Sequence, residues 1–413
     1  MTNSKFNSGL ITKPKIALVY DRVNTAHGGA EQVLLALHRQ FPEAPLYCGL
    51  ANLDKAKWAQ TIDVRPSFLR RFPSLANHHR RLAAILPFAL ESLDLSEFEV
   101  IISITSAECK AVITRPNQLH ICYLLTPPRY LYSHYQSQLA ALPWLIQGPA
   151  KLALKYLRWW DQAAMSRPDL IVPISKLISA RLIKYYPNLT FGSESDKSIK
   201  NGRQLLTPPI TPPAESFSEA HQEFNQLSSQ TQQQIIHHFG SLPKNYLLQF
   251  GRLVEYKRND LSIKAAIKLG QNLIVVGNGP ESARLKEMAA GHDNICFLNH
   301  LDRPSLGYLV KNARACLFPA LEDFGISALE TQLSGTPVVI HHQSGVGEVL
   351  AKDLTFTIVK ETLSEMTQVI SKIMKRRPQT DIMTRSGPKY DTLSFQSQFE
   401  KLVTTYWSKH DKS

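Results

Sequence analysis

Several features that mark common protein classes are missing from this sequence. Its five cysteines are an odd number and form no CxxC pair, which argues against a disulfide framework or a structural zinc site and indicates a reducing compartment such as the cytoplasm. No run of about 18 apolar residues occurs, and the first residues carry no apolar stretch of the kind that a secretory signal has. We therefore expect neither a membrane-spanning helix nor an export signal.

The sequence also lacks the phosphate-binding turn of the nucleotide-dependent dehydrogenases. No GxGxxG follows the first predicted strand, and no acidic residue stands about 20 positions beyond it, where that class needs one. We therefore exclude a dehydrogenase.

Positive charge, by contrast, is abundant. The chain has 47 Lys and Arg residues against 34 Asp and Glu, a net charge of +13, which suits nucleic acid, an anionic membrane or a phosphate-bearing substrate. No nucleic-acid-binding module is recognisable, so we expect no nucleic-acid partner. Residues 70–90 interleave basic and apolar side chains, which fits either contact with an anionic lipid leaflet or a helix packed into the N-terminal half.

Short apolar, β-branched runs alternate with longer segments of helical spacing, which is typical of βαβ units with a parallel sheet. Helices are expected at 31–39 and 151–164. Strands are expected at 15–20, 99–103, 120–125 and 169–173 in the first half, and at 246–250, 272–276, 294–298, 315–319 and 337–340 in the second.

The chain is long enough for two domains, and its composition changes between the two halves. Residues 191–245 contain two Pro-Pro pairs and a run rich in Gln and Ser, with a helix expected near 222–238. The predicted fold class is α/β, with two Rossmann-like, doubly wound domains that face a central cleft. The predicted parts are an N-terminal domain at 1–203, a linker or insertion at 204–243, a C-terminal domain at 244–392, and a terminal helix at 393–413 that packs back on the body.

The most informative segment is EDFGISALE, residues 322–330. It follows a predicted buried strand, so Glu322 is expected at the carboxyl end of that strand and Glu330 about one turn into the next helix. Gly325 lets the backbone approach a ligand, and the amides at the helix start, from Ile326, form an anion site. Carboxylates beside an anion site suit a ligand that carries both hydroxyls and phosphates. The alternative is a capping glutamate and a solvent-facing one.

The segment GRLVEYKRND, residues 251–260, carries a second set of charged side chains after a predicted strand. Arg252 and Lys257 are two cations at a strand's carboxyl end, and they suit a diphosphate whose charge they can neutralise as it departs. We interpret the neighbouring Arg258 as a solvated surface cation.

Two glycine turns have the same strand-to-helix position. Gly28 and Gly29 open the first predicted helix, and Gly277 lies in VVGNGPE, so backbone amides at both turns can meet an anion. Each turn is a weak signal alone.

Together, these segments resemble the retaining glycosyltransferases of family 4, which have the GT-B fold. The E-x7-E pattern of EDFGISALE carries the resemblance, with GGAE, GRLVEYKR, VGNGPE and SGTPVV, over both halves of the chain. Within that family, YLLTPPRYLY and YLRWWDQAAMSRPDLIVPIS are similar to the mannosyltransferase branch of O-antigen and capsule synthesis.

The resemblance implies a role for each matching residue. Arg252 and Lys257 would hold the donor diphosphate, and Glu322 would accept hydrogen bonds from the sugar hydroxyls. Glu330 would bind the ribose hydroxyls. The other donor-binding residues that it implies are Gly28, Gly29, Gly277, His300, Leu301, Phe324, Gly325, Ile326 and Ser327. The acceptor-side residues that it implies, in the N-terminal domain, are Leu125, Thr126, Arg129 and Tyr130.

The resemblance also implies the reaction. A hexose, with mannose favoured, would move from a nucleotide diphosphate sugar to a glycan or lipid-linked acceptor in cell-envelope polysaccharide synthesis, with retention of configuration. The donor is expected to be GDP-mannose rather than a UDP-sugar, and no cofactor is expected. No metal site is expected, because the chain lacks the Asp-x-Asp motif of the GT-A class. The location would be the cytoplasm, with peripheral contact at the inner face of the plasma membrane.

Two positions depart from the family pattern. The HTPxRY motif of the family reads LTPPRY here, so Leu125 replaces a histidine near the reacting sugar, and Pro173 replaces a small or polar residue. Leucine cannot hydrogen-bond a sugar. Two interpretations remain: a working transferase with an altered preference, and a non-catalytic protein of the same fold that binds a sugar nucleotide or glycan.

Overall fold

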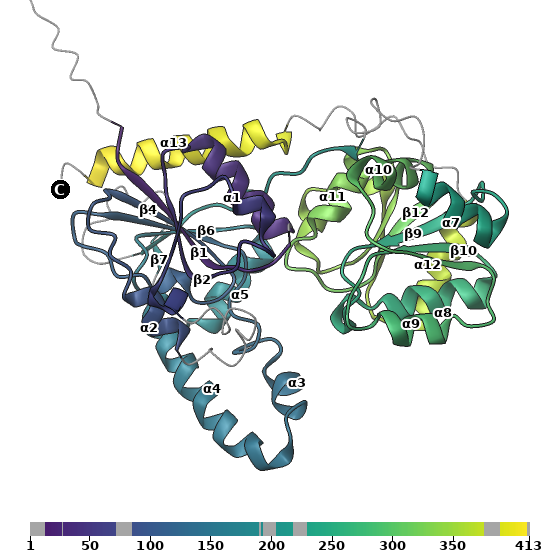
Figure 1. Ribbon diagram of the computed structural model, residues 1–413, viewed down its shortest axis with the longest axis horizontal. Coiled ribbons are helices and arrows are strands. Elements are labelled where there is room, and N and C mark those ends of the chain that lie inside the picture. The colour runs from purple at the N-terminus through teal and green to yellow at the C-terminus, as the bar shows by residue number, and fades with distance from the viewer. Residues whose placement is uncertain are drawn as a thin grey trace, which may run out of the picture. The chain divides into compact units, whose positions relative to one another are not determined.

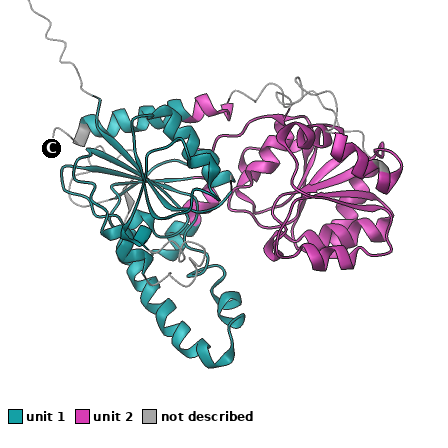
Figure 2. Ribbon diagram, viewed as in Figure 1, with its two compact units in different colours: residues 1–173, 181–209, 396–413 teal, residues 174–180, 210–395 magenta. Residues whose placement is uncertain are grey.

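The computed structural model describes residues 13–26, 28–71, 85–189, 191–192, 204–217, 229–375 and 389–410. The chain divides into two compact units, which Figure 2 distinguishes by colour. Unit 1 comprises residues 1–173, 181–209 and 396–413, and unit 2 comprises 174–180 and 210–395. Each unit is built on its own parallel sheet.

In its described part, unit 1 contains a parallel sheet in the order β3-β2-β1-β4-β5-β6-β8-β7, with helices on both faces (Figure 1). Its strands are β1 Ile16–Val23, β2 Leu46–Ala51, β3 Val64–Pro66, β4 Val100–Thr105, β5 Leu119–Leu124, β6 Leu170–Pro173, β7 Phe191–Gly192 and β8 Gln204–Leu206. The helices are α1 Gly29–Gln40, α2 Leu86–Glu91, α3 Tyr135–Ala140, α4 Trp144–Ala164, α5 Lys176–Tyr185, which begins in unit 2, and α13 Thr392–His410, which ends in unit 1.

The central strands of unit 1 are apolar along their whole length because both of their faces are covered. Every residue of β4 and β5 is buried. The terminal helix α13 covers part of one face: Phe399 packs edge-on against Tyr123 of β5, and Gln396 Nε2 donates to the carbonyl of Ala36 at 2.8 Å. The last helix of the chain therefore contributes to the core of the N-terminal unit.

In its described part, unit 2 has the sheet order β11-β10-β9-β12-β13-β14, all parallel. Its strands are β9 Tyr246–Phe250, β10 Asn272–Val276, β11 Ile295–Leu298, β12 Ala315–Phe318, β13 Val338–His341 and β14 Thr355–Ile358. The helices are α7 Ser229–Phe239, α8 Asn259–Leu269, α9 Ser282–Met288, α10 Arg303–Asn312, α11 Ile326–Leu333 and α12 Leu363–Lys375. In chain order this is the 3-2-1-4-5-6 arrangement of a Rossmann sheet, whose topological switch point lies between β9 and β12.

Alternation along β9 explains how unit 2 holds helices on both faces. Leu247 packs into one apolar cluster, with residues of α8 and α12, whereas Tyr246 and Leu248 pack into a second cluster that includes residues of α7 and α10. Successive strand residues point to opposite faces. A short run of apolar residues therefore serves two cores at once.

The expected strands all appear, and 246–250 and 272–276 match β9 and β10 at both ends. The expected helix near 222–238 corresponds to α7 within the described residues. Five strands were not anticipated: β2, β3, β7, β8 and β14. Most of these are short or lie toward the sheet edges, and β14 is only partly buried, so their apolar signal is weak.

The division into units differs in detail from the expected parts. The units meet in the sequence at 209/210 and 395/396, and the described residues of 210–243 belong to unit 2 rather than to a separate linker. Residues 174–180 also belong to unit 2. None of the helices in the described ranges combines the length and apolarity that crossing a bilayer requires.

Candidate active site

The predicted cation and the predicted carboxylate of the donor site lie together in unit 2. Lys257 is the last residue of the short 3-10 helix Glu255–Lys257, which follows β9. The strand β12 ends at Phe318, earlier than expected, so Glu322 lies in the loop after β12 and not at the end of the strand. The ammonium of Lys257 pairs with the carboxylate of Glu322. These loops leave the two strands that flank the switch point, where ligands of open α/β sheets bind.

Glycines fix the loop after β9 against the loop after β10. Gly251 has φ 127°, and a Cβ on Gly277 would lie 2.0 Å from the carbonyl oxygen of Gly251. A Cβ on Gly279 would likewise lie 2.1 Å from the carbonyl oxygen of Leu253. The glycine at the predicted donor-binding position 277 is thus required by backbone packing, whether or not a ligand is present.

A second loop, at 344–346, holds the loop that carries Glu322. The amide of Glu322 donates to Ser344 Oγ at 3.1 Å, and the amides of Gly345 and Val346 donate to the carbonyls of Glu322 and Phe324 at 3.1 and 2.9 Å. A Cβ on Gly345 would lie 2.2 Å from the carbonyl oxygen of Asp323. Sequence reasoning missed Ser344 and Gly345, whose only signal was SG in a loop after a strand.

Arg258 is not the solvated cation that we expected. It has φ 53°, its Nη1 lies 2.5 Å from Glu361 Oε2, and its Nε lies 3.3 Å from Asp260 Oδ1. Glu361 Oε1 also accepts from the amide of Leu321 at 3.4 Å. Arg258 and Glu361 therefore tie the start of α8 to the loop that carries Glu322.

The amino end of α11 follows the same loop. Gly325, at φ 108°, is the N-cap and contributes no capping side chain, and the half-buried Ile326 and Ser327 form the first turn. The backbone N–H groups of a first helical turn attract anions. The Glu322 carboxylate and the helix start thus lie on one short stretch of loop, and Lys257 reaches that carboxylate from the loop after β9.

Glu330, on the same helix, is buried and forms an ion pair with Arg303. Its Oε1 lies 3.2 Å from Nη2 of Arg303, which also donates to the carbonyl of Glu215 at 2.9 Å and stacks on Phe217. Arg303 is the first residue of α10. The predicted base-contacting residues His300, which is exposed, and Leu301, which is half-buried, directly precede this helix.

Of the predicted donor residues in unit 2, the remaining two differ in burial. Arg252 is exposed, whereas Phe324 is 5% exposed and packs inside the loop. An exposed guanidinium can reach a diphosphate, whereas the buried Phe324 can offer only its backbone.

In unit 1, the predicted glycines Gly28 and Gly29 begin α1. Gly28 is the N-cap, and a Cβ there would lie 2.9 Å from Glu31 Oε2. Glu31 is buried and accepts from Tyr20 Oη at 2.9 Å and from Thr25 Oγ1 at 3.0 Å. The glutamate of GGAE therefore holds the turn that presents the two exposed glycines.

Asp21, at the end of β1, has a structural role that the sequence did not indicate. It is buried and accepts hydrogen bonds from Thr105 Oγ1 and from the amides of Ser106, Glu108 and Cys109, at 2.7–3.0 Å. β1 and β4 flank the switch point of this sheet. Asp21 thus fixes the loop after β4 at the ligand-binding edge.

The predicted acceptor-side residues follow β5 and contact that loop. The amide of the half-buried Leu125 donates to the carbonyl of Thr105 at 2.8 Å, Thr126 is buried, and Arg129 is half-buried. Tyr130 Oη donates to Glu108 Oε1 at 2.9 Å. Leu125 and Tyr130 are thereby brought to the end of β4.

Glu108 is the titratable group in this region that sequence reasoning missed. Burial, aided by the Asp21 carboxylate and only partly opposed by Arg22, raises the pKa of the Glu108 carboxyl. No hydrogen-bond partner of its Oε2 is found within the described ranges, and Arg22 Nη1 lies 3.9 Å away. The only sequence signal was an acidic residue just after an apolar strand.

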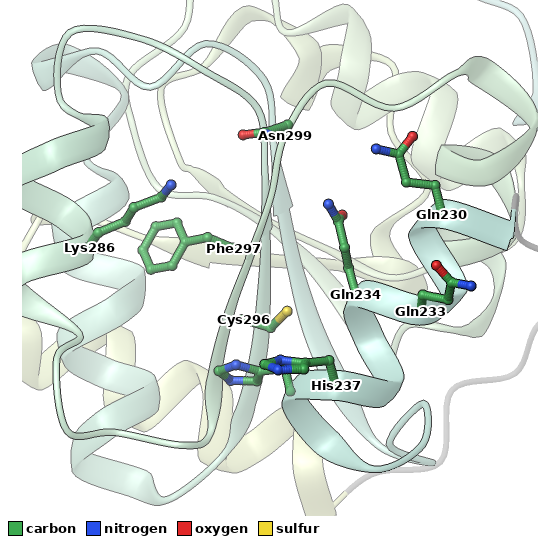
Figure 3. A pocket seen from close by; sticks show the side chains of 9 residues that line it. Gln230, Gln233, Gln234, His237, Lys286, Cys296, Phe297 and Asn299 are labelled. Carbon is green, nitrogen blue, oxygen red and sulfur yellow. The ribbon is translucent and has the colours of Figure 1, made fainter.

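A pocket of about 530 Å³ lies elsewhere in unit 2, beside the edge strand β11 (Figure 3). Gln230, Gln233, Gln234 and His237 of α7 line the pocket together with Cys296, and Lys286 of α9 and Phe297 line it as well. Consecutive strand residues point to opposite faces, so this pocket wraps a sheet edge. None of the predicted site residues lines it.

Among the described residues, no group of three or more His, Cys, Asp or Glu side chains is arranged to hold a metal ion.

Comparison with known proteins bears on both units. Residues 232–390 match the family model of glycosyl transferases group 1. The matched range spans nearly all of the described part of unit 2, including β9–β14 and the Lys257–Glu322 pair.

Curated relatives match a limited part of the chain. The D-inositol 3-phosphate glycosyltransferase of Mycolicibacterium paratuberculosis is 32% identical over 128 residues, which are 29% of this chain and 29% of the relative. A GDP-mannose-dependent alpha-(1-6)-phosphatidylinositol dimannoside mannosyltransferase of Mycobacterium tuberculosis is 33% identical over 124 residues, which are 28% of this chain and 32% of the relative. The chain thus spans about a third of the length of the curated relatives it matches.

Solved structures match along almost the whole chain. Sucrose-phosphate synthase from Thermosynechococcus elongatus aligns with a TM-score of 0.66 at 12% identity, covering 95% of this chain and 99% of that one. Anabaena Alr3699/HepE in complex with UDP aligns with a TM-score of 0.64 at 15% identity, covering 95% and 100%. These likenesses establish the fold: two Rossmann-like units of the GT-B type.

Proposed function

We propose that the protein is a glycosyltransferase that moves a hexose from a nucleotide diphosphate sugar to an acceptor hydroxyl. The observation that carries the proposal is the pairing of Lys257 with Glu322 at the switch point of unit 2, beside the uncapped start of α11. One cation, one carboxylate and a helix amino end match the phosphates and hydroxyls of such a donor. The family match of residues 232–390 supports the same reaction class.

The donor would replace the existing partners of both side chains. In the absence of a ligand, Lys257 and Glu322 neutralise each other. A bound diphosphate takes the ammonium of Lys257, with Arg252 as a second cation, and the sugar hydroxyls donate to Glu322. As the glycosidic bond to phosphate breaks, the charge that develops on the departing diphosphate is stabilised by Lys257, Arg252 and the amides of α11.

Glu330 would bind the ribose of the donor. Its carboxylate is held by Arg303 at one oxygen, and carboxylates readily accept from vicinal hydroxyls. The residues around His300 and Leu301 would contact the base.

We further propose retention of configuration, with the acceptor attacking from the face that the diphosphate vacates and a donor phosphate oxygen taking the acceptor's proton. Metal independence follows from the two side-chain cations. GDP-mannose is favoured as the donor, a preference that the name of one mycobacterial relative supports. The acceptor would be a glycan or lipid-linked sugar of the cell envelope, and the protein would work in the cytoplasm at the inner face of the plasma membrane. Residues 70–90, where membrane contact was expected, lie largely outside the described residues.

A second candidate is a non-catalytic binder of a sugar nucleotide, motivated by Leu125. The experiment that separates the two is a screen of GDP- and UDP-sugars, GDP-mannose and UDP-glucose included, for donor hydrolysis and for transfer to lipid extracts. Turnover of any donor above that of Glu322→Ala supports the transferase. Tight donor binding without turnover across the panel supports the binder.

A further inference from the structure

Helix α4 exposes large apolar side chains to solvent along its outer face. Leu145, Leu152, Tyr156 and Trp159, here called the outer stripe, are separated by seven, four and three residues, and Leu145, Leu152 and Trp159 are 68, 71 and 67% exposed. Such spacing places all four on one side of a helix. Trp144, at the helix start, is 79% exposed. In globular proteins, a stripe of this kind normally faces a core.

Within the part of the chain that the structure describes, the outer stripe has no core to face. The buried residues of α4 are Leu157, Trp160, Asp161 and Ala164, all in its last two turns, and α3 has no buried residue. Figure 1 shows α3 and α4 extending from the body of unit 1 as a helical hairpin. The first three turns of α4 therefore carry their apolar side chains away from the sheet.

The base of the hairpin is held firmly, so this exposure belongs to an ordered element. Trp160 Nε1 donates to Glu91 Oε1 at 3.0 Å, and Asp161 forms a buried ion pair with Lys110 at 2.5 Å. Asp161 also accepts from Tyr132 Oη and Tyr186 Oη at 2.8 and 2.6 Å. Arg158 stacks on Tyr135 of α3, with 4.7 Å between the guanidinium carbon and the ring centre.

The charge of the hairpin indicates which kind of surface it would bind. Residues 109–160 contain no Asp or Glu, and Lys151 and Lys155 are exposed beside the outer stripe. Helices that lie in a membrane interface combine Trp and Leu on one face with Lys at its border, and they bind anionic lipids. A protein partner would also cover the stripe, but the exclusively positive border favours a lipid leaflet.

We propose that the α3–α4 hairpin docks the protein on an anionic membrane surface through the outer stripe, Trp144, Lys151 and Lys155. The proposal rests on the proposed function in one respect, the choice of a lipid surface, because the proposed acceptor belongs to the cell envelope. Docking would bring unit 1, which carries the acceptor-side residues, to the membrane.

The test is flotation of the full chain with vesicles of phosphatidylcholine alone and of phosphatidylcholine with phosphatidylglycerol. The wild type is expected to float with the anionic vesicles, and added salt is expected to weaken this binding. Leu145→Ser/Leu152→Ser/Trp159→Ser is expected to remain with the unbound protein. Lys151→Gln/Lys155→Gln is expected to bind about 25-fold more weakly, about fivefold for each basic residue.

Matched controls keep the result interpretable. Leu393→Ser and Lys311→Gln remove an exposed apolar and an exposed basic residue of unit 2 and are expected to float like the wild type. The outer-stripe, lysine and unit 2 variants replace exposed side chains, so far-ultraviolet circular dichroism, which reports backbone structure, should match the wild type. Glu322→Ala is expected to float normally, which separates failure of docking from failure of the proposed chemistry.

Two outcomes overturn the proposal. One is a wild type that stays unbound to the anionic vesicles, and the other is an outer-stripe variant that floats as well as the wild type. If the wild type stays unbound but forms a concentration-dependent dimer that the outer-stripe variant lacks, the stripe is a contact between copies of this chain and not with lipid.

Discussion

The ammonium of Lys257 pairs with the carboxylate of Glu322 across the switch point of unit 2, although 65 positions separate them in the sequence. The pair is only partly buried, with side chains 31% and 14% exposed. A ligand can therefore reach both groups. In the proposed function, the phosphates of the donor bind Lys257 and its hydroxyls bind Glu322.

Removal of either partner is expected to impair the reaction severely without unfolding the protein. Glu322→Ala should abolish transfer, and Lys257→Ala should raise the barrier by about 2–4 kcal/mol, since a charge-stabilising group is lost where the leaving group departs. The double variant should lose little more than Glu322→Ala alone, because both residues act on one donor. The measurement is kcat/KM of each purified variant.

The control for this pair is Lys268→Ala, which removes an exposed lysine from α8. It should retain wild-type turnover. Wild-type rates in a folded Glu322→Ala or Lys257→Ala protein would remove both residues from the site.

Glu330→Ala is expected to raise the donor KM while leaving kcat nearly unchanged. The carboxylate would bind the ribose, which is remote from the reacting bond, so its contribution is equal in the ground and transition states. Its partner Arg303 has a side chain 41% exposed and is solvated once the pair is broken, so the fold should persist. Initial rates over a range of donor concentrations test this, with Glu287→Ala as an exposed control; a defect confined to kcat would contradict the ribose role.

Turnover is expected to continue in the presence of EDTA. In the proposed reaction, Lys257 and Arg252 supply the positive charge that a divalent ion would otherwise supply to the departing diphosphate. The measurement is the transfer rate before and after chelation. Loss of activity that Mg²⁺ or Mn²⁺ restores would refute the expectation.

Leu125 is expected to alter sugar or acceptor preference rather than to abolish turnover. Its amide is fixed by the carbonyl of Thr105, so the side chain of a Leu125→His variant would start from the same backbone position. In the proposed reaction the donor phosphate takes the acceptor's proton, so an imidazole would assist without being the sole base. Wild type and Leu125→His should both turn over, with different ranking of donors in a panel. A silent wild type beside an active variant would mean that this chain has lost catalysis.

The stability of the protein is expected to fall in mild acid because of His120. Burial, together with Arg167, lowers the pKa of this histidine to about 3, while an unfolded histidine titrates near 6.5. Between these values the unfolded chain binds a proton that the folded protein does not, so the contribution is complete above about pH 6.5 and is lost as pH falls toward about 3, by up to ~1.4 kcal/mol per pH unit.

Urea denaturation at a series of pH values tests this effect. His120→Gln should flatten the acid side of the profile, whereas His292→Gln, at an exposed position, should leave it unchanged. An acid slope that is the same in His120→Gln and the wild type would assign the effect to other groups.

Much of the fold could be predicted from the sequence because buried parallel strands are apolar on both faces. β9 and β10 were delimited at both ends for this reason, and Gly277 was recognised as a turn and Gly325 as a point of close backbone approach. The edge strand β14 was missed because its partly exposed residues dilute that pattern. The candidate donor residues were also chosen from sequence, because charged side chains just after buried strands lie at the edge where ligands of open α/β sheets bind.

The remainder depended on contacts between segments that are distant in the chain. The clamp on Glu322 comes from Ser344, Gly345 and Glu361, and Arg258, taken as solvated, is paired. Backbone amides and carbonyls make most of these contacts. Because almost every residue type has these groups, the sequence gives no signal for such contacts.

The outer stripe of α4 shows most plainly the difference between what the sequence determines and what the tertiary structure decides. Leu145, Leu152, Tyr156 and Trp159 have the spacing of a core-facing helix, and periodicity alone would bury them. Spacing specifies which side chains share a face of the helix. What that face contacts depends on where the sheet and its loops lie. Here most of α4 projects from the body of unit 1, so its apolar face packs against no core within the described residues.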